Sequence, residues 1–162
     1  MKLKIKDQIP DTDIFQLVDG EPQKSKLREI IGDGKNILFG LPGAFTSTCS
    51  KLHLPGFVAN ADKIKAKRIE NIFCLSVNDP YVMNGWGEIN NIGNSIKMLS
   101  DPYLLFTKAI GAEVDRNAKG MGIRSNRYLM VIENFTAVNI HVENETKECG
   151  LTSAENLLNN LI

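Results

Sequence analysis

Two short, almost wholly apolar runs constrain the fold of this chain more than any other feature of its sequence. They span residues 36–41 and 72–77, and an apolar run of this length is typical of a strand buried on both faces of a sheet. Between the runs, four apolar residues recur at helical spacing: Phe57, Val58, Ala61 and Ile64. A strand, a helix and a second strand predict a βαβ unit, in which the two strands are parallel and the crossover is right-handed.

The C-terminal third of the chain predicts antiparallel strands and a final helix. Residues 127–132 form a third apolar run, and apolar residues then alternate with polar ones up to Val142, as in a β-hairpin with one half-buried strand. Residues 152–155 have the Thr-x-x-Glu pattern of a helix capping box. At the other end, residues 2–6 alternate lysine with leucine and isoleucine, which indicates an edge strand. We therefore predict an α/β fold with a mixed central sheet flanked by helices on both faces.

The length and composition indicate an ordinary globular protein. With 162 residues, of which 43% are hydrophobic and 23% charged, we expect a single domain over residues 1–162 and no disorder. The 19 basic and 19 acidic residues cancel, so no global field attracts nucleic acid. No apolar run approaches the roughly 18–20 residues of a membrane span, and residues 1–10 have no apolar signal core. We therefore expect a cytoplasmic protein that binds neither nucleic acid nor membranes.

The cysteines and histidines narrow the chemistry further. The chain has three cysteines, an odd number that does not suit a secreted disulfide framework, so we expect reduced thiols. With two histidines and no Cys-x-x-Cys pair, the sequence offers no plausible metal cage. The glycines at positions 85, 87 and 93 do not form a phosphate loop after a strand, and no nucleotide cofactor is predicted.

One cysteine lies where a predicted strand leads into a predicted helix. Residues 42–43 (Pro-Gly) end the first apolar run, and residues 46–48 (Thr-Ser-Thr) can cap a helix that runs through Leu52 until Pro55 kinks or interrupts it. Cys49 falls in the first turn of that helix, where free backbone N–H groups and the helix dipole stabilise an anion. An ordinary thiol is only about 3% ionised at pH 7, and the thiolate is the nucleophile. Cys49 is therefore a candidate nucleophile, and the alternative is a small buried cysteine that only packs.

Residues 42–57, which read PGAFTSTCSKLHLPGF, resemble the peroxiredoxins. The family signature is a proline, three residues, a threonine or serine, two residues and a cysteine, here Pro42, Thr46 and Cys49. Three further segments match the type II or atypical branch, the peroxiredoxin-5-like group: residues 74–79, 86–87 and 122–127. The resemblance extends over nearly the whole chain. It implies a thioredoxin-like fold and a thiol-dependent peroxidase that reduces hydrogen peroxide and alkyl hydroperoxides without a cofactor or metal.

The resemblance also implies the roles of individual residues. Cys49 attacks one peroxide oxygen as a thiolate and becomes a sulfenic acid. Thr46 caps the helix, donates its hydroxyl to the sulfur or the peroxide, or does both, and Pro42 shields the thiolate without adding an N–H donor. The catalytic arginine of the family matches Arg127, which opens a predicted buried strand, where an unpaired charge is costly, and offers fixed donors to sulfur and oxygen. Arg124 is the less favoured alternative and is interpreted as a solvated loop charge.

Other side chains near the predicted site have weaker interpretations. His53 follows Cys49 by four residues and so shares its helix face, which makes a Cys–His pair conceivable. The family pattern gives this histidine no base role, and we interpret it as structural or interfacial. Phe45, Tyr81 and Trp86 fall near loops that help to form a dimer face in the family, so we expect a homodimer.

The remaining cysteines bear on how the oxidised Cys49 is reduced again. Animal-like members of the branch have a resolving cysteine in a Gly-Leu-Thr-Cys segment, but residues 150–153 here are Gly-Leu-Thr-Ser. Cys74 is central in an apolar run and is predicted to be core. Cys149 is a possible resolving residue, although a disulfide needs Cα atoms within about 7 Å. We predict a one-cysteine cycle in which thioredoxin, glutaredoxin or glutathione reduces Cys49, and the alternative is an internal Cys49–Cys149 disulfide.

Two other classes of protein compete with the peroxidase. The first is a non-enzymatic thioredoxin-like module that senses redox state or binds a partner, and the presence of Pro42, Thr46 and Arg127 together argues against it. The second is a thiol–disulfide oxidoreductase, which normally has a Cys-x-x-Cys pair. Here the position three residues before Cys49 is Thr46, so a local resolving thiol is missing.

Overall fold

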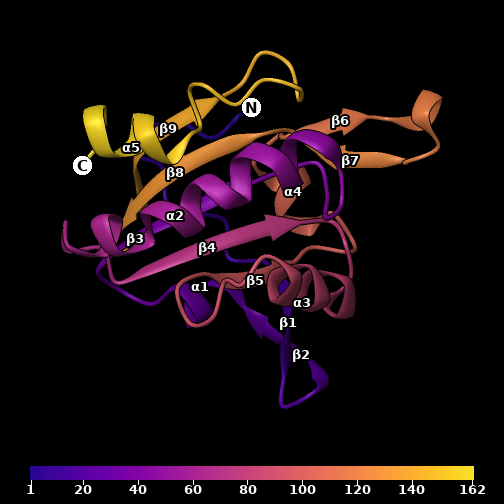
Figure 1. Cartoon of the computed structure of the whole chain (residues 1–162), viewed down its shortest axis with the longest axis horizontal. Coiled ribbons are helices and arrows are strands. Elements are labelled where there is room, and N and C mark those ends of the chain that lie inside the picture. Colours follow the sequence, from indigo (N-terminus) through magenta and orange to yellow (C-terminus); the bar gives the residue numbers. More distant parts are fainter.

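Seven strands form one mixed sheet in the computed structural model, which describes residues 1–162, and their order is β2-β1-β5-β4-β3-β8-β9. The strands are β1 (Asp13–Val18), β2 (Glu21–Lys26), β3 (Lys35–Gly40), β4 (Asn71–Ser76), β5 (Lys97–Ser100), β8 (Tyr128–Glu133) and β9 (Thr136–Val142). Two short strands, β6 (Glu113–Asp115) and β7 (Ile123–Ser125), pair in a separate hairpin that projects from one end of the molecule (Figure 1). The sheet is mixed as predicted, because β4 is parallel to β3 and β5 whereas the other pairs are antiparallel.

Helices cover both faces of this sheet, as predicted. They are α1 (Leu27–Ile31), α2 (Leu54–Lys65), α3 (Pro80–Ile89), α4 (Leu105–Ala109) and α5 (Ala154–Asn160), with a π-helical turn η1 (Cys49–His53) and a 3₁₀ turn η2 (Asn117–Lys119). Residues of α2, α3 and α5 pack with Ile37 and Phe39 of β3 in one core cluster, and residues of α1 and α4 pack with Leu38 in the other. Successive side chains of β3 thus enter opposite cores, which explains its continuous apolar run. No helix is long and apolar enough to span a membrane.

The predicted βαβ unit is confirmed. The apolar runs at 36–41 and 72–77 become β3 and β4, whose Phe39 and Cys74 are paired neighbours in a parallel ladder. The helix α2 connects them and lies along the central strands (Figure 1). Antiparallel β8 flanks β3 on its other side, with Tyr128 paired to Gly40. This register brings the start of β8 next to the loop that leaves β3, which is the loop that leads to Cys49.

One prediction near the N-terminus is wrong, and one hairpin there was not predicted. Residues 2–6 form no strand, because Lys6 has a left-handed backbone (φ 78°) within a turn, and only Gln8 makes an isolated bridge to Thr136. Conversely, β1 and β2 form a hairpin around the turn at Asp19 that no hydrophobic pattern indicates. The strand β2 lies at the sheet edge and is almost entirely exposed, so burial does not select apolar residues there.

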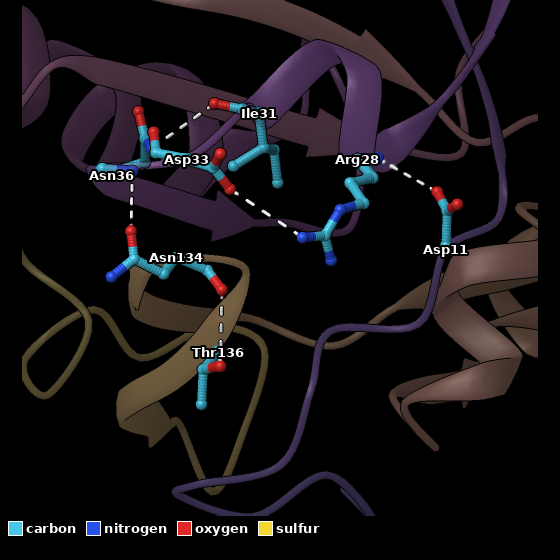
Figure 2. A network of polar contacts seen from close by, with 8 residues as sticks. Asp11, Arg28, Ile31, Asp33, Asn36, Asn134 and Thr136 are labelled. Carbon is cyan, nitrogen blue, oxygen red and sulfur yellow. Dashed lines mark hydrogen bonds and ion pairs between the residues drawn. The ribbon is translucent and has the colours of Figure 1, made fainter.

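A network of polar contacts fixes the end of β3 that is remote from Cys49 (Figure 2). The side chain of Asn36, the one polar residue of the apolar run, is buried and donates from Nδ2 to the carbonyls of Ile31 and Asp33, each at 3.4 Å. In the adjoining turn, the Asn134 side chain accepts from the Gly34 N–H at 3.2 Å. These bonds pair backbone groups that the end of α1 and the following loop leave open, so they tie α1, β3 and the β8–β9 turn together.

Candidate active site

Cys49 lies at the start of a helix whose first full turn is unusually wide. Helical geometry runs continuously from residue 47 to residue 65, but η1 is π-helical, and the Leu54 N–H donates to the Cys49 carbonyl five residues earlier. In a regular α-helix the Pro55 ring would clash with the Lys51 carbonyl, and that carbonyl would have no donor because proline has no N–H. The wide turn accommodates Pro55, so the helix continues where the sequence predicted a kink or interruption. Single π-helical turns inside α-helices occur frequently at functional sites.

The surroundings of Cys49 combine burial with free backbone donors. Its side chain is completely buried and belongs to the core cluster beneath α2. The backbone N–H groups of Ser47, Thr48 and Cys49 donate no hydrogen bond within the chain, as expected for the first residues of a helix. The sulfur therefore lies in a water-poor environment beside the positive end of a helix dipole.

Arg127 reaches this sulfur from the beginning of β8. It is the residue before β8, only 1% exposed, and its Nη2 donates to the Cys49 Sγ at 3.3 Å and to the Thr146 carbonyl at 2.8 Å. None of the four ion pairs of the chain involves Arg127. The positive charge of this buried guanidinium consequently faces the sulfur without a competing carboxylate.

His53 holds the other side of this guanidinium. Its Nδ1 lies 2.8 Å from Arg127 Nη1, and its Nε2 lies 3.0 Å from the Thr152 carbonyl. Because a carbonyl only accepts and a guanidinium only donates, Nε2 carries the proton and Nδ1 accepts from Arg127. Burial first, and the Arg127 charge second, lower the pKa of His53 to about 3, so the ring is neutral at physiological pH. It packs against Phe39 and Phe57 inside the chain, which supports the structural interpretation and excludes the interfacial one.

Thr46 and Pro42 lie beside the guanidinium, and Thr46 does not act as a helix cap. The Thr46 Oγ1 donates to the Gly43 carbonyl at 2.9 Å and caps no N–H of the helix, so the predicted N-cap role is wrong. Pro42, Thr46 and Arg127 line a cavity of about 270 Å³. A Cβ on Gly43 would come within 2.7 Å of the Arg124 Nη1, so a side chain there would displace the Arg124 guanidinium.

Arg124 differs from the predicted solvated loop charge. It lies in β7, is half-buried, and donates from Nε to the Met121 carbonyl at 2.8 Å and from Nη1 to the Pro42 carbonyl at 3.3 Å. No hydrogen bond joins it to Cys49. The sequence interpretation fails because the hairpin β6–β7 lies against the Pro42 loop, a contact between segments about eighty residues apart. Arg124 supports this loop, and Arg127 contacts the sulfur.

All three cysteines are free thiols, and their environments differ. Cys74 is completely buried in β4, and burial raises the pKa of its thiol well above the ordinary value, in agreement with the prediction of a core residue. Cys149 is half-buried between β9 and α5, and burial likewise raises the pKa of its thiol. Neither environment favours a second thiolate.

The segment that carries Cys149, residues 143–152, is held against the site by contacts that the sequence did not reveal. Its Thr146 and Thr152 carbonyls accept from Arg127 and His53. The buried Glu143 carboxylate accepts from the N–H of Thr152 at 2.8 Å and from its hydroxyl at 2.9 Å. In the sequence, the one sign of these contacts is His53, which lies on the same helix face as Cys49 and has no predicted partner.

The three aromatic side chains expected at a dimer face divide into two groups. Phe45 and Tyr81 are 58% and 57% exposed. Trp86 is buried, and its Nε1 donates to Ser50 Oγ at 3.1 Å, so its interpretation as an interface residue is wrong. No three His, Cys, Asp or Glu side chains form a group that could hold a metal ion.

Known proteins resemble this chain over nearly its whole length. The family model described as Redoxin matches residues 4–158. Peroxiredoxin-2D of Arabidopsis thaliana is 39% identical over 157 residues, 96% of each protein. The structure of reduced Prx3 from Vibrio vulnificus in complex with H₂O₂ is 38% identical, with a TM-score of 0.91 over 96% of this chain and 97% of that chain. The Plasmodium falciparum antioxidant protein, described as a 1-Cys peroxiredoxin, is 28% identical, with a TM-score of 0.89 over 96% of both chains.

These similarities agree with the buried thiol and arginine that the fold brings together. The predicted thioredoxin-like fold is confirmed, since the sheet and flanking helices superimpose on those of peroxiredoxin structures. The prediction of a thiol-dependent peroxidase is also confirmed, and the two competing classes are set aside. The chain therefore belongs to the Redoxin family, as a peroxiredoxin of the type II or atypical kind, and it is a thiol-dependent peroxidase.

Proposed function

We propose that Cys49 is the thiol that reduces the peroxide and that Arg127 is its principal catalytic partner. The observation that carries this proposal is the 3.3 Å contact between Arg127 Nη2 and Cys49 Sγ, made by a buried guanidinium without a carboxylate partner. A buried charge is costly unless an opposite charge accompanies it. The ionised sulfur of Cys49 supplies that charge, so the guanidinium and the free N–H groups of the helix favour the reactive thiolate.

The proposed reaction displaces one peroxide oxygen by sulfur. The Cys49 thiolate attacks the terminal oxygen of R–O–OH, an S–O bond forms, the O–O bond breaks, and the leaving RO⁻ takes a proton from water. Negative charge moves from sulfur to the leaving oxygen, and the cysteine is oxidised to a sulfenic acid. Donors fixed along this path stabilise the charge as it moves. The Arg127 Nε, which is buried and has no hydrogen-bond partner, is suited to this oxygen.

Thr46 and Pro42 are proposed to orient the peroxide. Because the Thr46 hydroxyl already gives its proton to the Gly43 carbonyl, its oxygen is left to accept the hydrogen of the attacked O–OH group. Pro42 lines the same cavity and has no N–H that could compete for the thiolate. The peroxide thus receives one acceptor from Thr46 and donors from Arg127.

We further propose a one-cysteine cycle, in which an external thiol reduces Cys49. The supporting observation is that residues 143–152 are bound to Arg127 and His53, and internally between Glu143 and Thr152, through buried hydrogen bonds that oppose a movement of Cys149 towards Cys49. A relative at 28% identity is described as a 1-Cys peroxiredoxin. Thioredoxin, glutaredoxin and glutathione are the proposed reductants, and a cytoplasmic location stays a prediction. Exposed Phe45 and Tyr81 support the proposed homodimer.

Mapping of the oxidised protein tests the site and the cycle together. One equivalent of hydrogen peroxide is added, sulfenic acid is trapped with a dimedone-type reagent, and the protein is digested without reduction for mass spectrometry. We expect the trapped adduct on Cys49 and free thiols on Cys74 and Cys149. A dominant Cys49–Cys149 crosslink, with turnover lost in Cys149→Ser, would instead establish an internal disulfide. An adduct on Cys149 alone would remove Cys49 from the proposed role.

Variants of His53 test whether it positions Arg127. His53→Gln offers an amide oxygen to Arg127 and an amide N–H to the Thr152 carbonyl, whereas His53→Leu leaves both groups unpaired. We expect His53→Leu to slow the reaction of Cys49 with peroxide about tenfold and His53→Gln to retain most of the rate, since one lost hydrogen bond to a charged group costs about 1.5 kcal/mol or more. Equal rates in the two variants would contradict a positioning role.

The buried His53 also predicts how the stability of the native chain and of His53→Gln depends on pH. The pKa of His53 is about 3 in the folded chain and 6.5 in an unfolded one, so below pH 6.5 the unfolded state binds a proton that the folded state does not. The contribution of His53 to stability is complete above pH 6.5 and is lost progressively towards pH 3, by up to about tenfold in the folding equilibrium per pH unit. Chemical denaturation at several pH values should show a shallower loss for His53→Gln than for the native chain.

A further inference from the structure

A basic cleft adjoins the peroxide cavity and is larger than a peroxide needs. The cavity of about 270 Å³ that Arg127 lines shares four residues with a neighbouring cavity of about 500 Å³. The shared residues are Arg116, Lys119, Thr146 and Lys147, and we call the two cavities together the basic cleft. A water molecule occupies about 30 Å³ of liquid, and hydrogen peroxide is only slightly larger. The basic cleft therefore has room for a second, larger reactant.

The charges of the basic cleft favour an anion. Arg116 and Lys119, which lie at the tip of the projecting β6–β7 hairpin (Figure 1), take part in no ion pair of the chain. Lys147 pairs with Glu145 at 2.8 Å, so these two charges compensate each other. Arg116 and Lys119 thus form no ion pair, although Arg116 lies within electrostatic range of Glu145, and Arg127 lines the smaller of the two cavities with them.

An unpartnered polar group in the same wall independently indicates a ligand. The Thr146 hydroxyl is buried and has no hydrogen-bond partner, although Thr146 lines both cavities. Buried polar groups without partners are rare in native proteins because leaving them unpaired is costly. An anionic ligand oxygen in the cleft would accept a hydrogen bond from this hydroxyl and would make an ionic contact with Arg116 or Lys119.

We propose that the basic cleft binds the carboxylates of a small acidic thiol, which is the reductant of oxidised Cys49. This inference rests on the one-cysteine cycle proposed above, in which Cys49 meets two external reactants, a peroxide and a thiol, and the charges of the cleft favour a reactant that carries carboxylates. Among thioredoxin, glutaredoxin and glutathione, only glutathione is a small thiol with carboxylates. Arg116 and Lys119 would hold the carboxylates while the sulfur points along the cleft towards Cys49.

Two molecules of the thiol supply the two electrons that reduce the Cys49 sulfenic acid. The thiolate R–S⁻ attacks the sulfur of the Cys49 sulfenic acid, an S–S bond forms, and hydroxide leaves and is protonated to water. A second R–S⁻ attacks the sulfur of R in the mixed disulfide, so that R–S–S–R forms and Cys49 departs as a thiolate. Cys49 is reduced by two electrons, and the two small thiols are oxidised to their disulfide.

The test compares two probe thiols in the same protein. Cys49 is oxidised with one equivalent of hydrogen peroxide, and its reduction is followed with mercaptosuccinate, which carries two carboxylates, and with neutral 2-mercaptoethanol, each rate constant being expressed per thiolate. We expect the double variant Arg116→Gln/Lys119→Gln to lower the ratio of the two rate constants by up to about fivefold for each cation removed. An unchanged ratio overturns the proposal. It does so also if the variant slows the oxidation of Cys49 by an anionic peroxide, because the cleft would then serve the peroxide and not the thiol.

Two further variants control for charge and for packing. Lys63→Gln/Lys67→Gln removes the same number of positive charges near the far end of α2 and should leave the ratio unchanged. An equal fall in both double variants would mean that the general field of the protein, and not the cleft, selects the thiol. Thr146→Val removes the unpartnered hydroxyl and should lower the ratio without lowering the melting temperature. A lower melting temperature with an unchanged ratio would make the hydroxyl purely structural.

A binding measurement separates this proposal from the role of Cys49. Succinate has the two carboxylates of mercaptosuccinate but no thiol, so its binding to the reduced protein, followed by NMR titration, does not depend on redox chemistry. We expect shifts at the amides of residues 116–119 and 144–147 that are weakened in Arg116→Gln/Lys119→Gln. Absence of succinate binding to the native chain overturns the proposed cleft, even if peroxide oxidises Cys49 as proposed. Succinate binding to a protein whose Cys49 is not oxidised by peroxide overturns only the proposed catalytic role of Cys49.

Discussion

Cys49→Ser is expected to abolish peroxide reduction, with turnover reduced by more than about 10⁴-fold, the scale on which loss of a catalytic nucleophile acts. The serine hydroxyl does not ionise at neutral pH, so neither the Arg127 guanidinium nor the helix N-terminus can convert it into a nucleophile. A hydroxyl still accepts the hydrogen bond that Arg127 gives to the sulfur. Because the hydroxyl does not supply the negative charge that the buried guanidinium needs, we expect the variant to fold with reduced stability, and its loss of turnover should be much larger than that loss of stability explains. Peroxide consumption in the presence of excess thiol measures the effect.

The matched control is Cys149→Ser, which makes the same atomic change at the half-buried thiol. We expect it to retain most of its turnover with an external thiol, because the proposed cycle does not use Cys149. If Cys49→Ser retained substantial activity while Cys149→Ser lost it, the catalytic thiol would be Cys149. Circular dichroism and thermal unfolding of both variants show whether a loss of activity comes from a loss of structure.

The central strands and the position of Cys49 at the start of a helix could be predicted from the sequence because their signals are local. Burial on both faces leaves β3 and β4 as uninterrupted apolar runs, and their predicted bounds differ from the observed ones by one residue. Pro42, Thr46 and Cys49 belong to a single contiguous segment, so their proximity follows from spacing alone. Arg127 could be predicted because a charge at the start of a buried strand requires a partner.

Features that depend on distant segments could not be predicted. The strand β2 is exposed at the sheet edge, where burial imposes no alternation of apolar residues. The contact of His53 with Thr152 joins residues 99 positions apart, and no local pattern encodes it. The same holds for Arg124 and Pro42, because that contact exists only after the β6–β7 hairpin has packed beside the loop. The wide turn η1 reconciles Pro55 with a continuous helix, which propensities alone describe as a break.

Arg127 tests how much of the rate comes from a fixed donor rather than from charge alone. Arg127→Ala removes the contact with the sulfur and leaves the His53 Nδ1 and the Thr146 carbonyl without a donor. Loss of one preorganised donor typically slows a reaction by about 10²–10³-fold, and we expect a loss of this size in the second-order rate constant for peroxide. Arg127→Lys keeps the charge but not the planar fork that serves three partners at once, so its rate should lie between those of Arg127→Ala and the native chain.

Arg124→Ala is the comparison that makes the Arg127 result specific. It removes a donor to the Pro42 carbonyl but no contact with the sulfur, so we expect a loss smaller than that of Arg127→Ala by at least about tenfold. Trp86, the single tryptophan of the chain, is hydrogen-bonded to Ser50 beside Cys49, and stopped-flow changes in its fluorescence can follow the oxidation of Cys49 in each variant. Equal losses, or a larger loss in Arg124→Ala, would transfer the catalytic assignment to Arg124.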